Sequence, residues 1–355
     1  MTSKPTIHDS QDEQVGNLAS QESNLSSLGV KSWRVWFVLS AAVLGVSSAG
    51  AIFQHVDQIP PLMRASWRLQ LTTLMLIPFA ISQYRKLTIE QRQLIFARDS
   101  VLLQIASGIF LAAHFGTWVI SLDHTSLTHS LLFVTAHPLI LLMMTVFAIR
   151  FGLFKSQKLR QPNRYEWLGA SAGLVGVVIT LQDIGGVQGT HQVSVFGDLM
   201  AFLGGVFVVG YLVIGRRLRK FTPLFIYATI VTGVAAILLA ISSLITEPST
   251  PTFGWVAGEW LFWFALLAFC AGIIGHTGLN YSLKHLPPLV ISVSVTLEPV
   301  IGSVIGFLLF SSGIPGFWTS IGGVVLLAGL MLVAYGSSSQ PTTADGTEGK
   351  SENQS

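Results

Sequence analysis

Residues 127–150 read LTHSLLFVTAHPLILLMMTVFAIR, and the only Lys, Arg, Asp or Glu among them is the final Arg150. An α-helix rises about 1.5 Å per residue, so this stretch is long enough to cross the roughly 30 Å hydrocarbon core of a bilayer. Residues 131–134 (LLFV) do not alternate between apolar and polar positions, as a strand of a membrane β-barrel would. The stretch therefore predicts a transmembrane helix.

Comparable apolar stretches follow one another between two polar tails. The chain of 355 residues is 51% hydrophobic and only 10% charged, whereas a soluble domain carries about 25% charged residues. We therefore expect an all-α membrane protein, with disordered cytoplasmic tails at residues 1–30 and 337–355. The ten predicted transmembrane helices are 33–54, 60–83, 100–121, 127–150, 165–182, 194–215, 222–246, 258–282, 287–311 and 315–336.

Among the connections between these helices, only every second one contains lysine or arginine. Positively charged loops favour the cytoplasmic side of a membrane. We therefore expect both termini in the cytoplasm and a multi-pass protein of the plasma (cell inner) membrane. The connections that contain no Lys or Arg are 55–59, 122–126, 183–193, 247–257 and 312–314.

The two halves of the chain resemble each other. Residues 121–124 (SLDH) match 282–285 (SLKH) at an offset of 161, and the same offset aligns His137-Pro138 with Glu298-Pro299 without a gap. Each half, 31–183 and 194–336, contains five predicted helices, an odd number, so the second half is expected to enter the membrane from the opposite side. Transporters built from inverted repeats commonly bind substrate near the midplane.

Several further motifs are similar to those of the drug/metabolite transporter superfamily, with its EamA-type repeats. The second predicted helix has Pro61, Arg68 and Pro78; other motifs are 197–201 (GDLMA), 215–218 (GRRL), 280–283 (NYSL) and 297–300 (LEPV). The resemblance covers about residues 33–336. It implies export of metabolites or amino acids, driven by a proton gradient or by exchange. The sequence departs from the family pattern at His137, where a small or polar residue usually precedes the proline.

Two arginines lie inside the second predicted helix. Charged residues within membrane helices are costly and usually face a cavity. The i, i+4 spacing puts Arg64 and Arg68 on one face, with Trp67 beside them. We predict that they bind an anionic group of the substrate. The alternative is that Arg64 extends to the membrane interface and Arg68 pairs with a structural acid.

His137 and Glu298 occupy equivalent positions, each about ten residues into its helix and therefore near the midplane. The prolines that follow them are expected to kink both helices and to open a polar cavity. We predict that both residues line the path and that one of them couples transport to protons. In the alternative interpretation, each side chain caps the broken turn of its own helix.

Other polar residues complete the predicted substrate site. His114 and Trp118 share one helix face and could bind an organic solute by stacking and one hydrogen bond. His276, Asn280 and Tyr281 form a polar cluster in the second half. Asp198 is expected to interact with the dipole of its own helix, and His129 to lie at the membrane interface. The glycines at 169, 173, 176, 322 and 329 are expected to pack helices or protomers together.

These features predict a secondary active transporter that moves a small organic metabolite by alternating access. No enzyme signature, Walker loop or metal-ligand pattern was found, and no cofactor is expected. The alternatives are an exchanger of phosphorylated or nucleotide-linked metabolites and, in a different class, a membrane-embedded enzyme or receptor. The expected partners are the solute and the lipid bilayer, with a homodimer left open and no nucleic acid.

Overall fold

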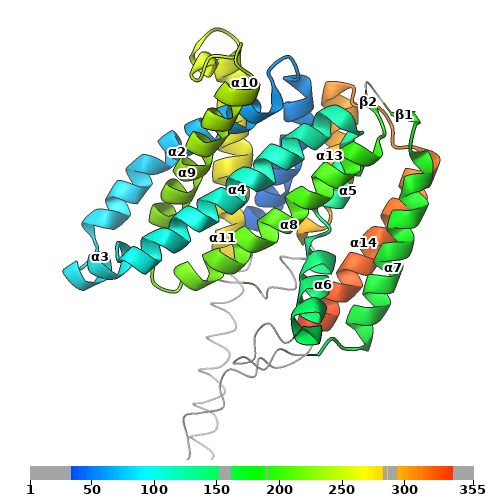
Figure 1. Ribbon diagram of the computed structural model, residues 1–355, viewed down its shortest axis with the longest axis horizontal. Coiled ribbons are helices and arrows are strands. Elements are labelled where there is room, and N and C mark those ends of the chain that lie inside the picture. The colour runs from blue at the N-terminus through cyan, green and yellow to red at the C-terminus, as the bar shows by residue number, and fades with distance from the viewer. Residues whose placement is uncertain (1–32, 152–160, 189–190, 283–285, 287–293, 339–355) are drawn as a thin grey trace, which may run out of the picture.

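The computed structural model describes residues 33–151, 161–188, 191–282, 286 and 294–338. Almost all of these residues are helical (Figure 1). The helices, in chain order, are Trp33–His55, α2 (Pro61–Arg85), α3 (Ile89–Ile95), α4 (Arg98–His124), α5 (Leu127–Val134), α6 (His137–Arg150), α7 (Arg164–Thr180), η1 (Leu181–Asp183), α8 (Val195–Leu218), α9 (Leu224–Thr246), η2 (Gly254–Val256), α10 (Trp260–Leu267), η3 (Ala268–Thr277), α11 (Gly278–Ser282), α13 (Glu298–Phe310) and α14 (Phe317–Ser338). Two short strands, β1 (Val187–Gln188) and β2 (His191–Gln192), form an antiparallel hairpin.

Seven helical segments are long and apolar enough to cross a membrane. Each of them overlaps one of seven predicted stretches, which confirms a multi-pass membrane protein. Of the other three stretches, 60–83 corresponds to α2 and 165–182 to the 17-residue α7. The third, 287–311, contains the 13-residue α13, and its residues 287–293 lie outside the described part. The count of ten and the inverted repeat remain predictions.

Side-chain caps define where several helices begin. The Ser126 hydroxyl accepts a hydrogen bond from the backbone of His129 at the start of α5. Asn163 and Glu166 form a reciprocal capping box at the start of α7. The carboxylate of Glu247, at the end of α9, accepts hydrogen bonds from the first backbone N–H groups of α2. These acceptors satisfy donors that a helix leaves unpaired at its first turn.

Pro138 and Pro299 each lie in the first turn of a helix. Pro138 is in the first turn of α6, and Pro299 in the first turn of α13. Proline lacks the N–H that an interior residue would donate, but the first turn needs no such donor. The predicted stretch 127–150 is therefore two helices, α5 and α6, that are separated at residues 135–136. The proline ends a helix here instead of kinking a continuous one.

Three helix pairs make the main contacts: α7 with α14, α4 with α8, and α2 with α9. The first pair runs side by side at the right of Figure 1. A Cβ at Gly169 would lie 2.6 Å from the carbonyl oxygen of Gly329, so any larger residue would force the two backbones apart. These glycines therefore pack two helices of the same chain.

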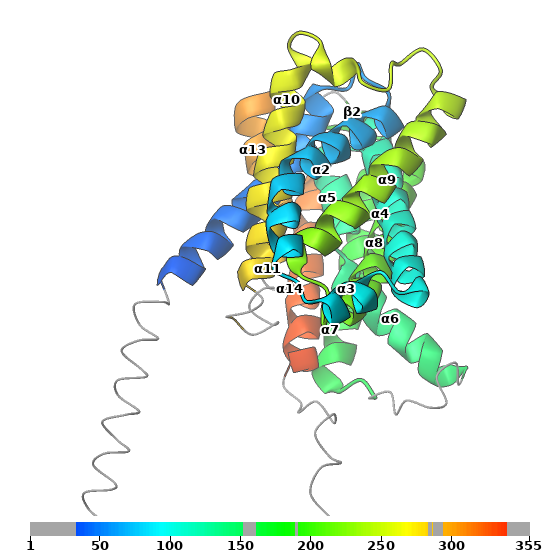
Figure 2. The ribbon, with the colours of Figure 1, turned by 90° about the vertical axis from the view of Figure 1, so that its left-hand side faces the viewer.

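The two ends of the bundle differ in charge. Arg85, Arg98, Arg150 and Arg219 lie at or near the helix ends at one side, which we name the basic end. The connections at the other side, the opposite end, contain no Lys or Arg. Figure 2 shows α3 and one end of α6 toward the basic end, and α10 and β2 toward the opposite end.

Candidate functional site

Arg68 is buried in the middle of the α2–α4 contact. Its side chain is 2% exposed, and the guanidinium carbon lies 4.3 Å from the ring centre of Phe115 and 5.7 Å from that of Phe53. Its Nε and Nη1 donors have no hydrogen-bond partner among the described residues. Burying an unsatisfied donor on a charged group is costly. The site therefore presents unused hydrogen-bond donors to any acceptor that reaches it.

Three other residues predicted from the sequence interact with this arginine, and a fourth interacts with one of the three. Arg68 interacts electrostatically with Glu298 of α13, His276 of η3 and His114 of α4. His114 also interacts with His137, the first residue of α6. Side chains from five helical segments thus meet in one region.

A narrow cavity leads from Arg68 toward the basic end. It has a volume of about 50 Å³, and its wall includes Thr72, His276 and the aromatic pair Tyr211 and Tyr227. It reaches Leu224, the first residue of α9. Pockets for small organic ligands usually measure about 300–1,000 Å³. A solute of several heavy atoms could enter only if the helices moved apart.

His114 and Trp118 are stacked against each other, and neither of them lines this cavity. Their rings are 6.0 Å apart with an interplanar angle of 14°. His114 Nδ1 donates to the backbone carbonyl of Gly204 at 2.8 Å, because a carbonyl can only accept. The indole Nε1 of Trp118 is buried and has no acceptor within the described chain. The pair therefore adds a further unused donor to the region.

Arg64 and Trp67 have structural partners. Arg64 is fully buried, forms an ion pair with Asp123 and donates to the carbonyl of Phe53 at 2.7 Å. The Trp67 indole donates to the carbonyl of Thr252 at 3.0 Å. These contacts join α2 to α4 and to the connection between α9 and α10. Neither residue lines the Arg68 cavity described above.

The second-half polar cluster is divided. His276 lies in η3, a ten-residue π-helical segment, and π-helices are uncommon and often found at functional sites. Tyr281 is 45% exposed and does not line the cavity. The side chain of Asn280 lies outside the described part of the chain. Only His276 of the three is therefore shown beside Arg68.

Sequence reasoning missed two buried polar groups. Tyr227 bonds to the hydroxyl of Ser107 at 2.7 Å, next to Tyr211 in the cavity wall. At the opposite end, His129 bonds to Asp198 at 3.0 Å and is fully buried instead of lying at an interface. One sequence signal pointed to this pair. Asp198 lies at the end of the protein where the connections contain no Lys or Arg, so histidine is the only other cationic side chain that could pair with it.

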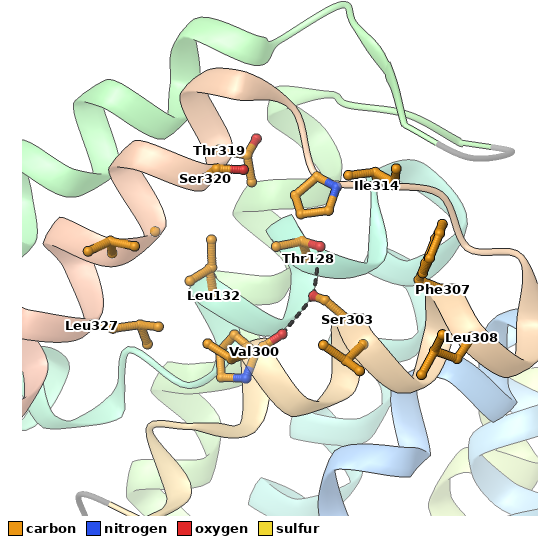
Figure 3. A pocket seen from close by; sticks show the side chains of 15 residues that line it. Thr128, Leu132, Val300, Ser303, Phe307, Leu308, Ile314, Thr319, Ser320 and Leu327 are labelled. Atoms are coloured by element: carbon orange, nitrogen blue, oxygen red, sulfur yellow. Dashed lines mark hydrogen bonds between the residues drawn. The ribbon is translucent and has the colours of Figure 1, made fainter.

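A second hollow lies on the side of the bundle between α5, α13 and α14 (Figure 3). It has a volume of about 400 Å³ and is lined mainly by apolar side chains such as Leu132, Val304 and Phe307. Its polar residues include Thr128 and Ser303, which bond to each other at 2.7 Å. None of its lining residues is Lys, Arg, His, Asp or Glu. It therefore lacks the charged groups that distinguish the Arg68 region.

Known proteins resemble this chain in both sequence and fold. Residues 195–335 match the EamA-like transporter family. A WAT1-related protein of Arabidopsis thaliana is 23% identical, covering 87% of this chain and 88% of that protein. The uncharacterized transporter YyaM of Bacillus subtilis is 25% identical, covering 78% and 85%. A solved crystal structure superposes with a TM-score of 0.56 over 84% of this chain and 96% of its own, at 18% identity, which supports the fold alone.

Proposed function

We propose that the chain is an EamA-like transporter of the drug/metabolite transporter superfamily and that it exports a small organic metabolite bearing an acidic group. Arg68 binds the acid. The observation that carries this proposal is a guanidinium that is almost fully buried and yet has donors without acceptors. Guanidinium donors match a planar carboxylate in both geometry and charge.

The residues around Arg68 suggest the rest of the solute. Phe53 and Phe115 border the guanidinium with apolar surface, and Glu298 lies within electrostatic reach of it. A carboxylate on Arg68 would leave Glu298 to attract a cationic group of the same molecule. This combination fits an amino acid or a similar zwitterion.

A phosphorylated or nucleotide-linked solute fits less well. Such a solute carries more negative charge than one guanidinium neutralises. Among the described residues that line the cavity, Arg68 is the only Lys or Arg. We therefore favour a solute with a single acidic group.

The direction and mechanism follow from the cavity. It extends toward the basic end, which the distribution of Lys and Arg assigns to the cytoplasm, and this supports loading from the cytoplasmic side. The small volume supports alternating access, because the halves 31–183 and 194–336 must move apart to admit a solute. Both termini are then cytoplasmic in a plasma (cell inner) membrane, and His137 and Glu298 are the candidates for proton coupling.

The test compares each acid with its amide. Purified protein is screened by thermal shift against amino acids and other small carboxylates, each paired with the corresponding amide, because only ligands of the folded state raise the melting temperature. The wild type should bind the acid, and Arg68→Gln should weaken binding about 10–100-fold, as expected for hydrogen bonds to a charged group. Arg98→Gln, which removes an exposed arginine at the basic end, is the matched control.

Three outcomes are informative. Equal binding of acid and amide by the wild type would exclude recognition of the carboxylate. Unchanged binding by a folded Arg68→Gln variant would assign Arg68 a structural role. Loss of binding by Arg98→Gln as well would indicate a general charge effect and contradict a specific site.

A further inference from the structure

Far from the Arg68 cavity in the fold, a buried chain of hydrogen bonds joins helices at the opposite end. His129 of α5 contacts the carboxylate of Asp198 of α8 through Nδ1 at 3.0 Å, and the hydroxyl of Thr319 of α14 through Nε2 at 2.7 Å. The Thr319 hydroxyl also contacts Oδ2 of Asp183, at the end of η1, at 2.7 Å. His129, Thr319 and Asp198 are 0%, 1% and 4% exposed, so solvent does not dilute these contacts.

The hydrogens in this chain can be counted. The contacts Asp198–His129, His129–Thr319 and Thr319–Asp183 each require one hydrogen. A neutral imidazole supplies one and a hydroxyl supplies one, whereas an ionised carboxylate supplies none. Three contacts therefore share only two permanently bound hydrogens. An imidazolium at His129, which donates from both nitrogens, supplies the third.

The remaining contacts do not change this count. Thr125 donates its own hydroxyl hydrogen to Asp198 at 2.7 Å. The backbone N–H of Thr319 donates to Asp183 at 2.6 Å, and the Gln188 amide donates to the Thr319 hydroxyl at 3.1 Å. Each of these donors brings its own hydrogen, so the deficit stays at one.

Other charged groups are engaged elsewhere. α5 packs against α4, α8, α13 and α14. On α4, Asp123 pairs with Arg64, and His124 bonds to the carbonyl of Ile120 in its own helix. Glu298 starts α13 and lies in the Arg68 region. Within the described chain, no lysine or arginine forms an ion pair with Asp198, whose salt-bridge partner is His129.

We propose that Asp198, His129, Thr319 and Asp183 form a proton-binding site that holds one exchangeable proton and thereby joins α5 to α8 and α14. Release of this proton leaves one of the three contacts without a hydrogen. A buried contact between two acceptors is unfavourable, so the helices then separate more easily at the opposite end. The site is independent of which solute binds at Arg68.

The test uses the pH dependence of unfolding. The proposed site holds a proton that the unfolded chain releases, and an imidazole in an unfolded chain releases its proton near pH 6.5. The stabilisation that this proton provides is fully present below about pH 6.5 and decreases as the pH rises, until the folded site releases its proton. The unfolding equilibrium constant should increase by up to tenfold per pH unit in this range. We expect the melting temperature of the protein in nanodiscs to fall accordingly between pH 6.5 and 8.5.

Asp198→Asn is the decisive variant. The Asn amide can donate to His129 Nδ1 while its oxygen still accepts from Thr125, so three contacts then have three permanent hydrogens. The variant should keep its fold and lose this part of the pH dependence. Thr319→Val, which removes the acceptor of Nε2, should lose it too and serves if Asp198→Asn does not fold.

His124→Gln is the matched control, because it removes a nearby histidine whose imidazole hydrogen-bonds to the carbonyl of Ile120 in its own helix. It should retain the wild-type profile. Parallel profiles for the wild type, Asp198→Asn and Thr319→Val would overturn the proposal. Loss of the same slope in His124→Gln would overturn it as well, since the proton would then reside outside the four residues.

Discussion

Arg64 and Arg68 lie one turn apart on α2 and have opposite surroundings. Arg64 is ion-paired with Asp123 and bonded to the carbonyl of Phe53, whereas Arg68 has two donors with no partner in the described residues. Both side chains are buried to a similar extent. The difference separates an arginine that holds two helices together from one that is available to bind a ligand.

Removing the charge of Arg64 should therefore destabilise the protein. Breaking a buried ion pair costs about 3–5 kcal/mol, because it leaves the partner uncompensated, and the side chain of Asp123 is 22% exposed, which favours the lower value. Arg64→Gln should lower the melting temperature, whereas Arg68→Gln should change it little. Asp123→Asn serves in a double-mutant cycle with Arg64→Gln. Additive effects of the two changes would contradict a direct pair.

The orientation of the chain can be tested by thiol labelling. Ser249, before α10, and Gln192, in β2, are exposed at the opposite end, and Gln91 in α3 is exposed at the basic end. A Cys270→Ala background removes the only native cysteine. Ser249→Cys and Gln192→Cys should react with an impermeant reagent added to intact cells, because segments without Lys or Arg favour the outside. Gln91→Cys should react only after the cells are opened, and labelling of Gln91→Cys in intact cells would reverse the orientation.

Much of the candidate site was predictable from the sequence because depth in a membrane follows from counting. The runs of apolar residues locate the helices. A rise of about 1.5 Å per residue puts His137 and Glu298 near the midplane, and Arg68 and His114 in the outer half of the membrane. The structure brings these residues into one region. Counting residues does not show which of the two arginines forms an ion pair, because Asp123, the partner of Arg64, is 59 residues away in the sequence.

The missed features have a common physical cause. Asp198 and His129 were each assigned a local role, as a helix-dipole partner and as an interfacial residue, yet they bond to each other across 69 residues. Such pairing depends on how α5 and α8 pack, which apolar periodicity does not specify. The interruption before Pro138 was likewise predicted as a kink, since the sequence alone does not show whether the helix ends or bends there.

Trp67 should act mainly by holding the connection between α9 and α10. Its indole donates to the carbonyl of Thr252, and its ring packs edge-on against Phe264 at 5.1 Å. Trp67→Phe retains an aromatic ring and loses one hydrogen bond, for a cost of about 1 kcal/mol. We expect faster hydrogen exchange in residues 247–259 and unchanged solute affinity. A large loss of affinity in Trp67→Phe, with normal exchange in that segment, would instead make Trp67 a ligand of the solute.

The last prediction concerns the role of His137 in proton coupling. His137 lies at the break between α5 and α6, within electrostatic reach of His114. His137→Gln keeps a polar side chain but cannot bind a proton. It should abolish accumulation driven by a pH gradient and leave solute exchange measurable, because exchange requires the binding site but no net proton movement. The two assays are run on the same liposomes: accumulation under an imposed gradient and counterflow without one.

The two assays together distinguish a loss of proton coupling in His137→Gln from a loss of structure. Equal loss of accumulation and counterflow in His137→Gln would indicate a collapsed site. Full retention of gradient-driven accumulation would exclude His137 as the coupling group and leave Glu298, which lies near Arg68 from the other half of the chain, as the next candidate. Glu298→Gln, tested in the same pair of assays, should then lose accumulation and keep counterflow, since a proton bound to this carboxylate would be the one that moves with each cycle.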